Sequence, residues 1–379
     1  MIASDVQAFP RRDPVGPDLS SGLDPDQVAL LADALVPHAE EVDAHGVQRP
    51  TIDLLADAGL LGSPLSPAGM QRELGELIAG CDASTWFCWV QHQAPLRILE
   101  AATPGPNAPA AQALRQALLP GLRSGELLAA VAHAHVRRLG PPNPTATRVD
   151  GGWQLNGTLD WVTSWDIADV VMVMAQGTGP DAESLVCAYL PAGASGDEIP
   201  GVAAGAPLDL LAMSGTHTRP VTFSAARVPV ERVGAVLSRE EWLARDAVSS
   251  SDANPAAFGL ARASIAELDA LAMQRSDPSL AELSDALAEE CRGVRRGAYS
   301  AIEDPDAPIE VRLSYRAAAL ELAVRSATAV VIARAGGAMR KGQPAERRVR
   351  EAMFLLVQAQ TAATRRASLA RISGTTASP

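Results

Sequence analysis

The feature that most constrains this chain is a change in sequence pattern along it. Two Ala- and Leu-rich stretches flank a middle third that is rich in β-branched residues and turn signals. In the first stretch, apolar residues recur at three- and four-residue steps from Asp24 onward, a spacing that places them on one face of a helix. Roughly the first 125 residues are therefore predicted to be helical. Asp24 should cap the first helix, with Pro25 at its first position.

The middle third begins near Gly140, where short β-prone runs alternate with turn signals. Asp150-Gly151-Gly152 and Asn156-Gly157 each have the composition of a hairpin turn. Further strands are expected over residues 170–175, 185–190 and 221–228. This stretch predicts a small, β-barrel-like domain.

Helical periodicity returns from about Glu240, with long segments near 254–275, 279–300, 309–335 and 345–373. Four such segments indicate a helix bundle. The expected fold class is α+β and mostly α. It has an N-terminal helical domain over residues 1–125, a β-domain over 126–238 and a C-terminal four-helix bundle over 239–379. Because the faces of the bundle need partners, a homodimer or homotetramer is expected.

Charge and composition exclude several classes of function. The net charge of −12 argues against a nucleic-acid partner, which would need a basic face. Two local basic clusters, Arg137-Arg138 and the arginines of 347–350, either hold an anion or lie on a solvated helix face. No segment reaches 18 uncharged apolar residues, and the N-terminus has no apolar run after a basic start. The sequence therefore predicts a cytoplasmic protein without a membrane partner.

Cysteine spacing adds a redox expectation. Cys81, Cys88, Cys187 and Cys291 form no close-spaced metal pattern, and a chain of 379 residues does not need disulfides for stability. We expect all four to be reduced and buried.

Several stretches, in this order along the chain, resemble one family. They are "GCDASTWFCWVQHQ" (80–93), "GGWQLNGTLDWVTSWDIADVVMVMAQ" (151–176), "LDLLAMSGTHTRPVTFSAARVPVERV" (208–233) and "GGAMRKGQPAERRVREA" (336–352). Together they resemble the acyl-CoA dehydrogenase superfamily, whose layout is helices, a small β-domain and a four-helix bundle. The resemblance implies a flavin cofactor, FAD with FMN as an alternative. By the same resemblance Trp161 lies beside the flavin ring, while Thr163 and Ser164 offer hydrogen bonds to its N5 edge and phosphates. Without the resemblance, this segment would be an ordinary amphipathic hairpin with a core tryptophan.

The chain departs from the family at the catalytic base. The usual Glu-Gly-Thr segment aligns with Ala359-Gln360-Thr361, and alanine cannot accept a proton. By resemblance, Gln360 and Thr361 still close the cofactor site. Some members place the carboxylate on the first bundle helix, where Asp252 stands in this chain. An aspartate after three serines is also a common helix N-cap, so both interpretations of Asp252 stay open.

Two flavin-binding passages of the family are also altered. His133 and His135 replace its flavin-pyrimidine loop, and alternation along a strand would put both imidazoles on one face. They could bind a substrate or an oxygen intermediate, or simply form a polar surface. A zinc site is not expected, because no third ligand is evident nearby. In the family, a second passage contacts the dinucleotide across a subunit interface; here it is shortened and keeps Arg275 but not the aromatic residue or the glycine. By resemblance, Gly336-Gly337 and Thr361 close the cofactor site.

Three functions follow from these patterns. The first is α,β-desaturation of an acyl thioester, carried by coenzyme A or a carrier protein, with hydride transfer to flavin and Asp252 as candidate base. The second is a reduced-flavin monooxygenase, which does not need the missing glutamate and in which His133 or His135 would bind the oxygen species. The third is a catalytically silent subunit of a heteromeric enzyme.

Overall fold

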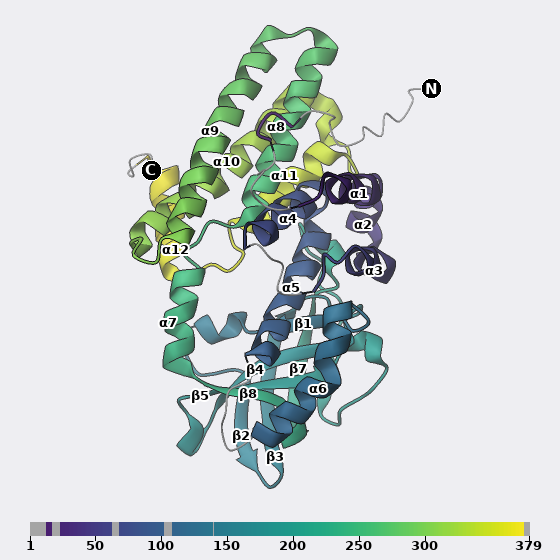
Figure 1. The fold of residues 1–379 in the computed structure, drawn as a ribbon, viewed down its shortest axis with the longest axis vertical. Helices are drawn as coiled ribbons and strands as arrows, with labels where there is room; N and C mark the ends of the chain where they lie inside the picture. Colours follow the sequence, from purple (N-terminus) through teal and green to yellow (C-terminus); the bar gives the residue numbers. More distant parts are fainter. Residues whose placement is uncertain (1–12, 17–22, 63–67, 102–107, 139, 375–379) are drawn as a thin grey trace.

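The computed structural model describes residues 13–16, 23–62, 68–101, 108–138 and 140–374, and places the sheet at one end of the molecule and the long C-terminal helices at the other (Figure 1). Asp24 caps α1 as predicted, through a capping box with Gln27. The helices of the first third are α1 (Pro25–Leu35), α2 (Ala39–His45), α3 (Arg49–Asp57), α4 (Ala68–Cys81), α5 (Ala83–Glu100) and α6 (Ala108–Ser124).

An eight-stranded sheet forms the middle third. Its strands run in the order β6-β7-β3-β2-β4-β5-β8, and β1 pairs in parallel with β4. The strands are β1 (Ala129–Ala132), β2 (Thr145–Val149), β3 (Gly152–Val162), β4 (Val170–Gly177), β5 (Ser184–Pro191), β6 (Val202–Ala204), β7 (Arg219–Pro229) and β8 (Val233–Ser238).

Strand β4 is buried on both faces, and this explains its unbroken apolar sequence. Val171 and Val173 point into a core shared with β3 and β7. Met172 and Met174 point the other way, into a core shared with α5 and α6. Alternate side chains of a strand face opposite sides of a sheet, so two cores sandwich this strand. The sheet thereby fixes α5 in place, and α5 supplies one wall of the site described below.

Of the two expected hairpin turns, only the first is a turn. Asp150-Gly151 joins β2 to β3, whereas Asn156-Gly157 lies inside β3 as a bulge, with a register shift against β7 between Leu155 and Gly157. Gly157 has φ 123°, and a Cβ there would lie 2.0 Å from Asn143 Oδ1. The prediction of a second hairpin is wrong because Asn-Gly also suits a bulge, and only the partner strands distinguish the two.

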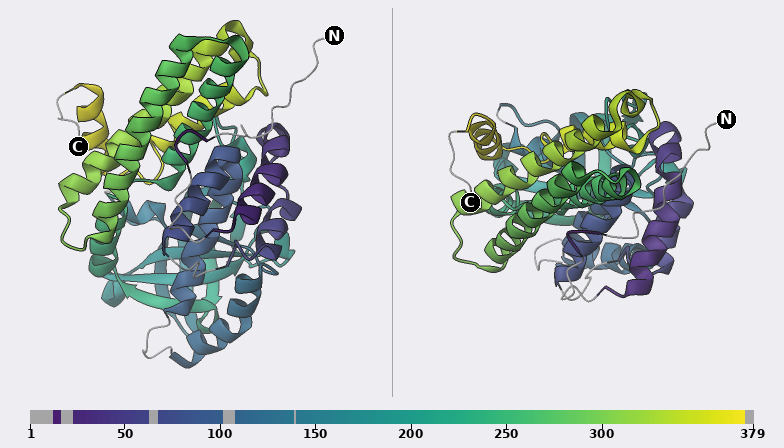
Figure 2. Two further views of the ribbon diagram at one scale, coloured as in Figure 1. Left: turned by 45° about the horizontal axis from the view of Figure 1, so that its top comes forward. Right: turned by 90° about the horizontal axis from the view of Figure 1, so that it is seen from above.

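The C-terminal third contains α7 (Arg239–Ser249), α8 (Pro255–Arg275), α9 (Pro278–Glu303), α10 (Ile309–Arg334), α11 (Pro344–Leu355) and α12 (Ala362–Ile372). Seen from above, the long helices α8, α9 and α10 lie alongside one another (Figure 2). The single helix expected over 345–373 is broken into α11 and α12. Ala359 adopts a left-handed φ of 49° in the intervening turn, and Thr361 caps α12. A left-handed residue ends an α-helix, so the continuous helix is a wrong prediction.

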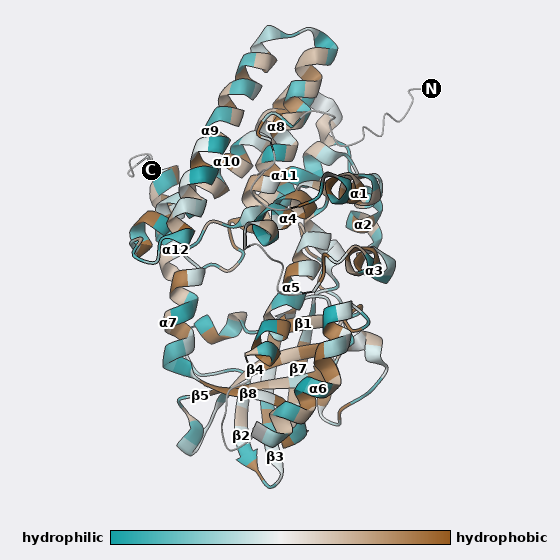
Figure 3. Cartoon of the chain, in the orientation of Figure 1, coloured by the Kyte–Doolittle hydropathy of each residue, from teal (hydrophilic) through white to brown (hydrophobic). Residues whose placement is uncertain are grey.

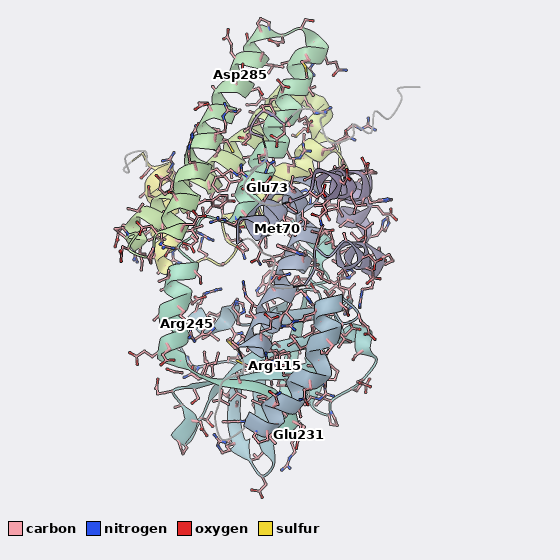
Figure 4. All side chains as sticks on the ribbon, in the orientation of Figure 1. Met70, Glu73, Arg115, Glu231, Arg245 and Asp285 are labelled. Carbon is pink, nitrogen blue, oxygen red and sulfur yellow. The ribbon has the colours of Figure 1, made fainter. Side chains whose placement is uncertain are left out.

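Close contact between α4 and α8 joins the first third to the last. A Cβ on Gly259 would lie 2.1 Å from the Glu76 carbonyl oxygen, so only glycine permits this approach. Beside this contact, Arg262 and Arg295 bind the buried carboxylates of Glu73 and Glu76. Glu73 is labelled in Figure 4, where α4 meets the C-terminal helices. A buried charge without a partner is costly, so these ion pairs specify how the two helices dock.

Hydropathy follows this architecture. In Figure 3 brown, apolar segments gather in the sheet and in α4, while α9 carries many polar residues. Among the described residues, no helix combines the length and apolar character needed to cross a membrane. All four cysteines are buried and free, as expected.

Candidate functional site

A cavity of about 700 Å³ lies between the sheet, α5 and α11. Its walls come from one face of α5, the end of β1, the 3₁₀ helix η2 (Ala134–Arg137), the end of β3, the 210–218 loop and the turn after α11. Small-molecule sites have volumes of about 300 to 1,000 Å³ and mostly apolar walls. This cavity therefore has the size and character of a ligand site.

The Trp161 indole and the Thr163 hydroxyl both line this cavity, at the end of β3. Trp161 is 55% exposed, which is unusual for so large an apolar side chain. Its ring is thus available to a ligand and is not used in the core. Thr163 lies next to Thr216 and Thr218, which line the same wall.

The three threonine hydroxyls form a chain with a defined direction. Thr216 Oγ1 donates to the Met213 carbonyl (2.7 Å), so its own oxygen accepts from Thr218 (2.8 Å). Thr218 Oγ1 has then used its proton and accepts from Thr163 (3.1 Å). Each hydroxyl has one proton. Thr163 Oγ1 therefore offers the cavity an acceptor, and its preferred partner is a ligand N–H or O–H.

Ser164 does not share this position. It is completely buried, has φ 65° and donates its backbone N–H to the Thr216 carbonyl (2.8 Å). The left-handed conformation turns its side chain out of the strand alternation and away from the cavity wall. Ser164 is therefore absent from the cavity wall, and its expected contact with the flavin stays a prediction.

His133 and His135 do not share a strand face, because β1 ends at Ala132 and His135 lies within η2. Only His133 lines the cavity. Burial, then the positive charges of Arg137, His135 and Arg97, lower the pKa of His133 to about 3, so its imidazole is neutral and a weak base. His135 binds the Met174 carbonyl through Nε2 (2.6 Å), and burial lowers its pKa to about 4.

Asp252 fits neither of the two interpretations left open by the sequence. The N-cap of α8 is Asn254, whose side chain accepts from the backbone N–H of Ala256 (3.0 Å). The carboxylate of Asp252 instead binds Arg312 (2.7 Å) and does not line the cavity. This ion pair makes Asp252 part of a structural contact between α10 and the segment before α8.

The turn between α11 and α12 brings Gln358 and Ala359 to the cavity wall, as the alignment with the family's base position implied for Ala359. Gln360 and Thr361 do not line it. Gln360 Nε2 donates to the Leu356 carbonyl (3.0 Å), and Thr361 is engaged in capping α12. Their expected role at the cofactor is not supported by these positions.

Arg275, Gly336 and Gly337 lie together at the far end of the bundle. Arg275 ends α8 and donates to the Ala333 carbonyl (2.7 Å), and both glycines are exposed in the 3₁₀ helix η7 (Ala335–Met339). The 21 residues of α8 span roughly 30 Å, so these residues are far from the cavity within one chain.

Several polar residues of the cavity wall carry no signal in the sequence. Arg97 and Gln91 come from α5, which is only weakly amphipathic and buries polar residues as well as apolar ones, so no periodic pattern marked them. Arg137 binds Asp246 of α7 through two hydrogen bonds of 2.6 Å each. Sequence patterns do not reveal that pairing, because the two residues lie 109 positions apart.

The arginine run 347–350 was also misjudged, since it holds neither a free anion site nor a solvated face. Arg347 and Arg348 are buried against Glu351 and Glu267. Arg350 lines the cavity but binds Asp43 and Glu346.

No carboxylate lines the cavity among the described residues. Its titratable wall groups are His133 and three arginines. Also within the described part of the chain, no three His, Cys, Asp or Glu side chains are grouped to hold a metal ion. The cavity thus offers an aromatic wall, hydroxyl and amide groups and positive charge, but no anionic base.

The order of the elements, with a sheet between two groups of helices, defines the class of the fold. The chain has the acyl-CoA dehydrogenase fold, shared with related flavoenzymes, as the sequence resemblance implied. It is similar to butyryl-CoA dehydrogenase of Megasphaera elsdenii, with a TM-score of 0.71, 17% identity and coverage of 93% of this chain and 99% of that one. A glutaryl-CoA dehydrogenase of Mycobacterium smegmatis, solved with FADH2, gives a TM-score of 0.72, 16% identity and coverage of 94% and 97%.

A monooxygenase is equally similar. Dibenzothiophene monooxygenase of Paenibacillus sp. A11-2 gives a TM-score of 0.71, 18% identity and coverage of 93% and 98%. A curated relative, the mitochondrial 2-methylacyl-CoA dehydrogenase of Solanum tuberosum, is 30% identical over 128 residues, which are 31% of this chain and 29% of that protein. No family model matches the chain. At these identities the comparisons establish the fold and leave the reaction to be argued from the site.

Proposed function

We propose that this protein is a flavin-dependent oxidoreductase whose reaction needs no carboxylate base, and that it transfers oxygen to a small-molecule substrate using a reduced flavin. The observation that carries this proposal is the absence of any carboxylate from the described cavity wall. Proton abstraction next to a thioester requires a base with a pKa near the working pH. His133, with a pKa of about 3, is too weak for that task.

The wall residues suit a flavin. Trp161 offers an exposed aromatic surface to a planar ring, and Thr163 presents an acceptor at the same wall. A flavin carries a proton on N5 only when it is reduced, so an acceptor there suits the reduced form. When bound, the flavin would supply electrons to oxygen. The substrate would gain one oxygen atom, and the other would leave as water with the two electrons and protons of the reduced flavin.

The protein itself would bind and orient the substrate and would exclude water from the cavity. Phe87 of α5 and Phe354 of α11 pack edge to face, with ring centres 5.1 Å apart, and both line the cavity. Neutral His133 could donate or accept one hydrogen bond without taking a proton. We keep FAD and FMN both open, and a cytoplasmic location stays a prediction from the sequence.

The decisive experiment is a visible spectrum of the purified protein with added flavin, followed by anaerobic reduction. Oxygen transfer predicts that flavin is reduced only by an added reductase or dithionite. Reoxidation by oxygen should then be coupled to substrate oxidation. Bleaching of the bound flavin by acyl thioesters alone would contradict the proposal and favour desaturation. A protein that binds no flavin would leave the silent-subunit hypothesis.

Desaturation remains the second candidate, because the curated relative is an acyl-CoA dehydrogenase. The Ala359→Glu variant tests it directly, since Ala359 lines the cavity where the family places its base. If the site was built for thioesters, a carboxylate there should create or increase thioester-driven bleaching by about a hundredfold or more. Ala359→Gln is the matched control, because it adds similar bulk without a base.

A further inference from the structure

Arg97 lies at one end of the cavity and has no ion-pair partner among the described residues. Three arginines line the cavity, and Arg137 and Arg350 are both held by carboxylates. The Arg97 guanidinium forms no hydrogen bond or ion pair with any described residue. Glu100 lies near enough to raise its pKa, but that carboxylate makes its own ion pair with Arg123 (2.9 Å).

The Arg97 guanidinium is accessible from the cavity, and its surroundings raise the free energy of its charged form. Arg97 is exposed because the cavity admits solvent, yet the protein around it desolvates the guanidinium enough to lower its pKa. Structural arginines elsewhere in this chain, such as Arg262 and Arg348, have carboxylate partners. A cation held in a partly desolvated cavity without a counter-charge is stabilised when a ligand brings one.

The neighbours of Arg97 suit an anion. His133 and Arg137 line the same end of the cavity, and Arg97 and Arg137 both act on the titration of His133. No described acidic side chain lines the cavity to repel an anion. A neutral imidazole beside a free guanidinium can complete the hydrogen bonds of a phosphate or carboxylate.

The position of Arg97 separates it from the proposed flavin wall. Phe87 and Arg97 are ten residues apart on α5, which is about 15 Å along the helix. The Thr163 wall lies near the Phe87 end, because its neighbour Ser164 contacts Cys88. The two ends of the cavity therefore present different chemistry to a ligand.

We infer that the substrate of this cavity carries an anionic group, a phosphate or a carboxylate, which Arg97 binds at the end of the cavity formed by α5 and η2. The inference rests on the proposed function only in taking the cavity as the substrate site. Arg97 is then a specificity-determining residue that favours anionic over neutral substrates.

The test uses inorganic phosphate as the probe, followed by calorimetry and by NMR of histidine-labelled protein, with and without saturating FMN. We expect saturable binding that shifts the His133 resonance and persists with FMN bound. Arg97→Gln should weaken phosphate binding by about tenfold to a hundredfold. Arg138→Gln is the matched control. It removes a neighbouring charge that is paired with Asp160 outside the cavity, and binding should stay within about twofold.

Three results would overturn the inference: no saturable phosphate binding, binding unchanged in Arg97→Gln, or loss of phosphate binding on adding FMN but not riboflavin. The third would assign Arg97 to the phosphate of the flavin. An unfolding temperature of Arg97→Gln equal to that of the wild type shows that the variant folds. This result is expected because the Arg97 side chain has no partner among the described residues. A protein that takes up no flavin but binds phosphate through Arg97 would refute the proposed function and leave this inference standing.

Discussion

At the residue scale, burial decides which polar groups of this protein are available for chemistry. His92 is completely buried, and its Nδ1 accepts from the backbone N–H of Ala129 (3.0 Å). Its Nε2 must then carry the proton that is donated to the Leu122 carbonyl (2.9 Å). This pair of bonds requires a neutral ring, and His92 thereby ties α5 to β1 and to the end of α6.

His92 predicts a dependence of stability on pH. Burial lowers its pKa from 6.5 to about 4, so below pH 6.5 the unfolded chain binds a proton that the folded chain does not. The contribution of His92 to the free energy of unfolding is therefore fully present above pH 6.5. It is lost as the pH falls toward 4, and the loss reaches about 3 kcal/mol. Chemical denaturation between pH 4 and 8 should show a shallower loss in His92→Gln than in the wild type. His38→Gln, at an exposed position, should leave the slope unchanged. Equal slopes for all three proteins would refute the assignment.

Trp161 predicts a separation of binding from stability. Because its ring is mostly exposed, Trp161→Ala should change the free energy of unfolding by no more than about 0.5 kcal/mol. Loss of an aromatic contact with the flavin should raise the flavin dissociation constant about three- to tenfold. Flavin fluorescence titration measures the second quantity, and Trp161→Phe should retain most of the affinity. A large loss of stability with unchanged flavin affinity would make Trp161 a structural residue.

At the element scale, the break between α11 and α12 shapes the site. Buried Arg316 of α10 donates to the Asp252 carbonyl (2.9 Å) and to the Gln358 carbonyl (3.0 Å). Burial lowers its pKa only to about 10, so it stays charged at neutral pH. The Asn254 side chain also donates to Gln358 Oε1 (3.1 Å). The turn that carries Ala359 is therefore held against the start of α8 by side chains from two helices.

Arg316→Met should loosen this turn. It removes two hydrogen bonds from a charged donor, and we expect a loss of about 2 to 3 kcal/mol in unfolding free energy with faster amide hydrogen exchange over residues 356–361. Arg312→Met is the matched control, because Arg312 contacts Asp252 and Asp304 but not the turn. It should lower stability without faster exchange at 356–361. Similar exchange in both variants would show that Arg316 does not hold the turn.

At the scale of the whole molecule, three of the predicted cofactor-binding residues lie at the opposite end of the bundle from the cavity. Arg275, Gly336 and Gly337 cannot reach a flavin in the cavity of the same chain. The family resemblance implies that Arg275 contacts the dinucleotide across a subunit interface, and its distance from the cavity requires that this contact be made to the flavin of a second copy. Such an arrangement links cofactor choice to assembly.

This arrangement predicts that FAD binds more tightly than FMN only in the oligomer. Arg275→Gln should reduce FAD affinity about tenfold and leave FMN affinity unchanged, because FMN lacks the adenine half. Flavin titrations at several protein concentrations, with sedimentation measurements of mass, test the link. Arg296→Gln, at an exposed position on α9, is the control. An FAD preference that persists in the monomer, or in Arg275→Gln, would refute it.

The sequence by itself determined the fold class and most of the helices and long strands, but it did not reveal β6, β8 or α7. Apolar residues at helical spacing marked the helical segments of the first third and helices α8, α9 and α10. Residues 170–175, 185–190 and 221–228 lie within β4, β5 and β7. These signals are local, because side-chain direction repeats every 3.6 residues in helices and every two in strands. The resemblance to the acyl-CoA dehydrogenase superfamily singled out Trp161, Thr163 and Ala359, and all three line the cavity. The three-domain boundaries stay a prediction.

Only the tertiary structure decided which polar residues meet at the site. Arg97 has no carboxylate partner in the described part of the chain because Glu100 is bound to Arg123. Asp252 is absent from the cavity wall and is bound to Arg312. Ser164 turns away from the cavity on a left-handed backbone. Each outcome depends on partners far apart in the sequence, or on a backbone angle set by packing. Pairing of charges and the cost of burying them are properties of three-dimensional neighbours, which no local pattern encodes.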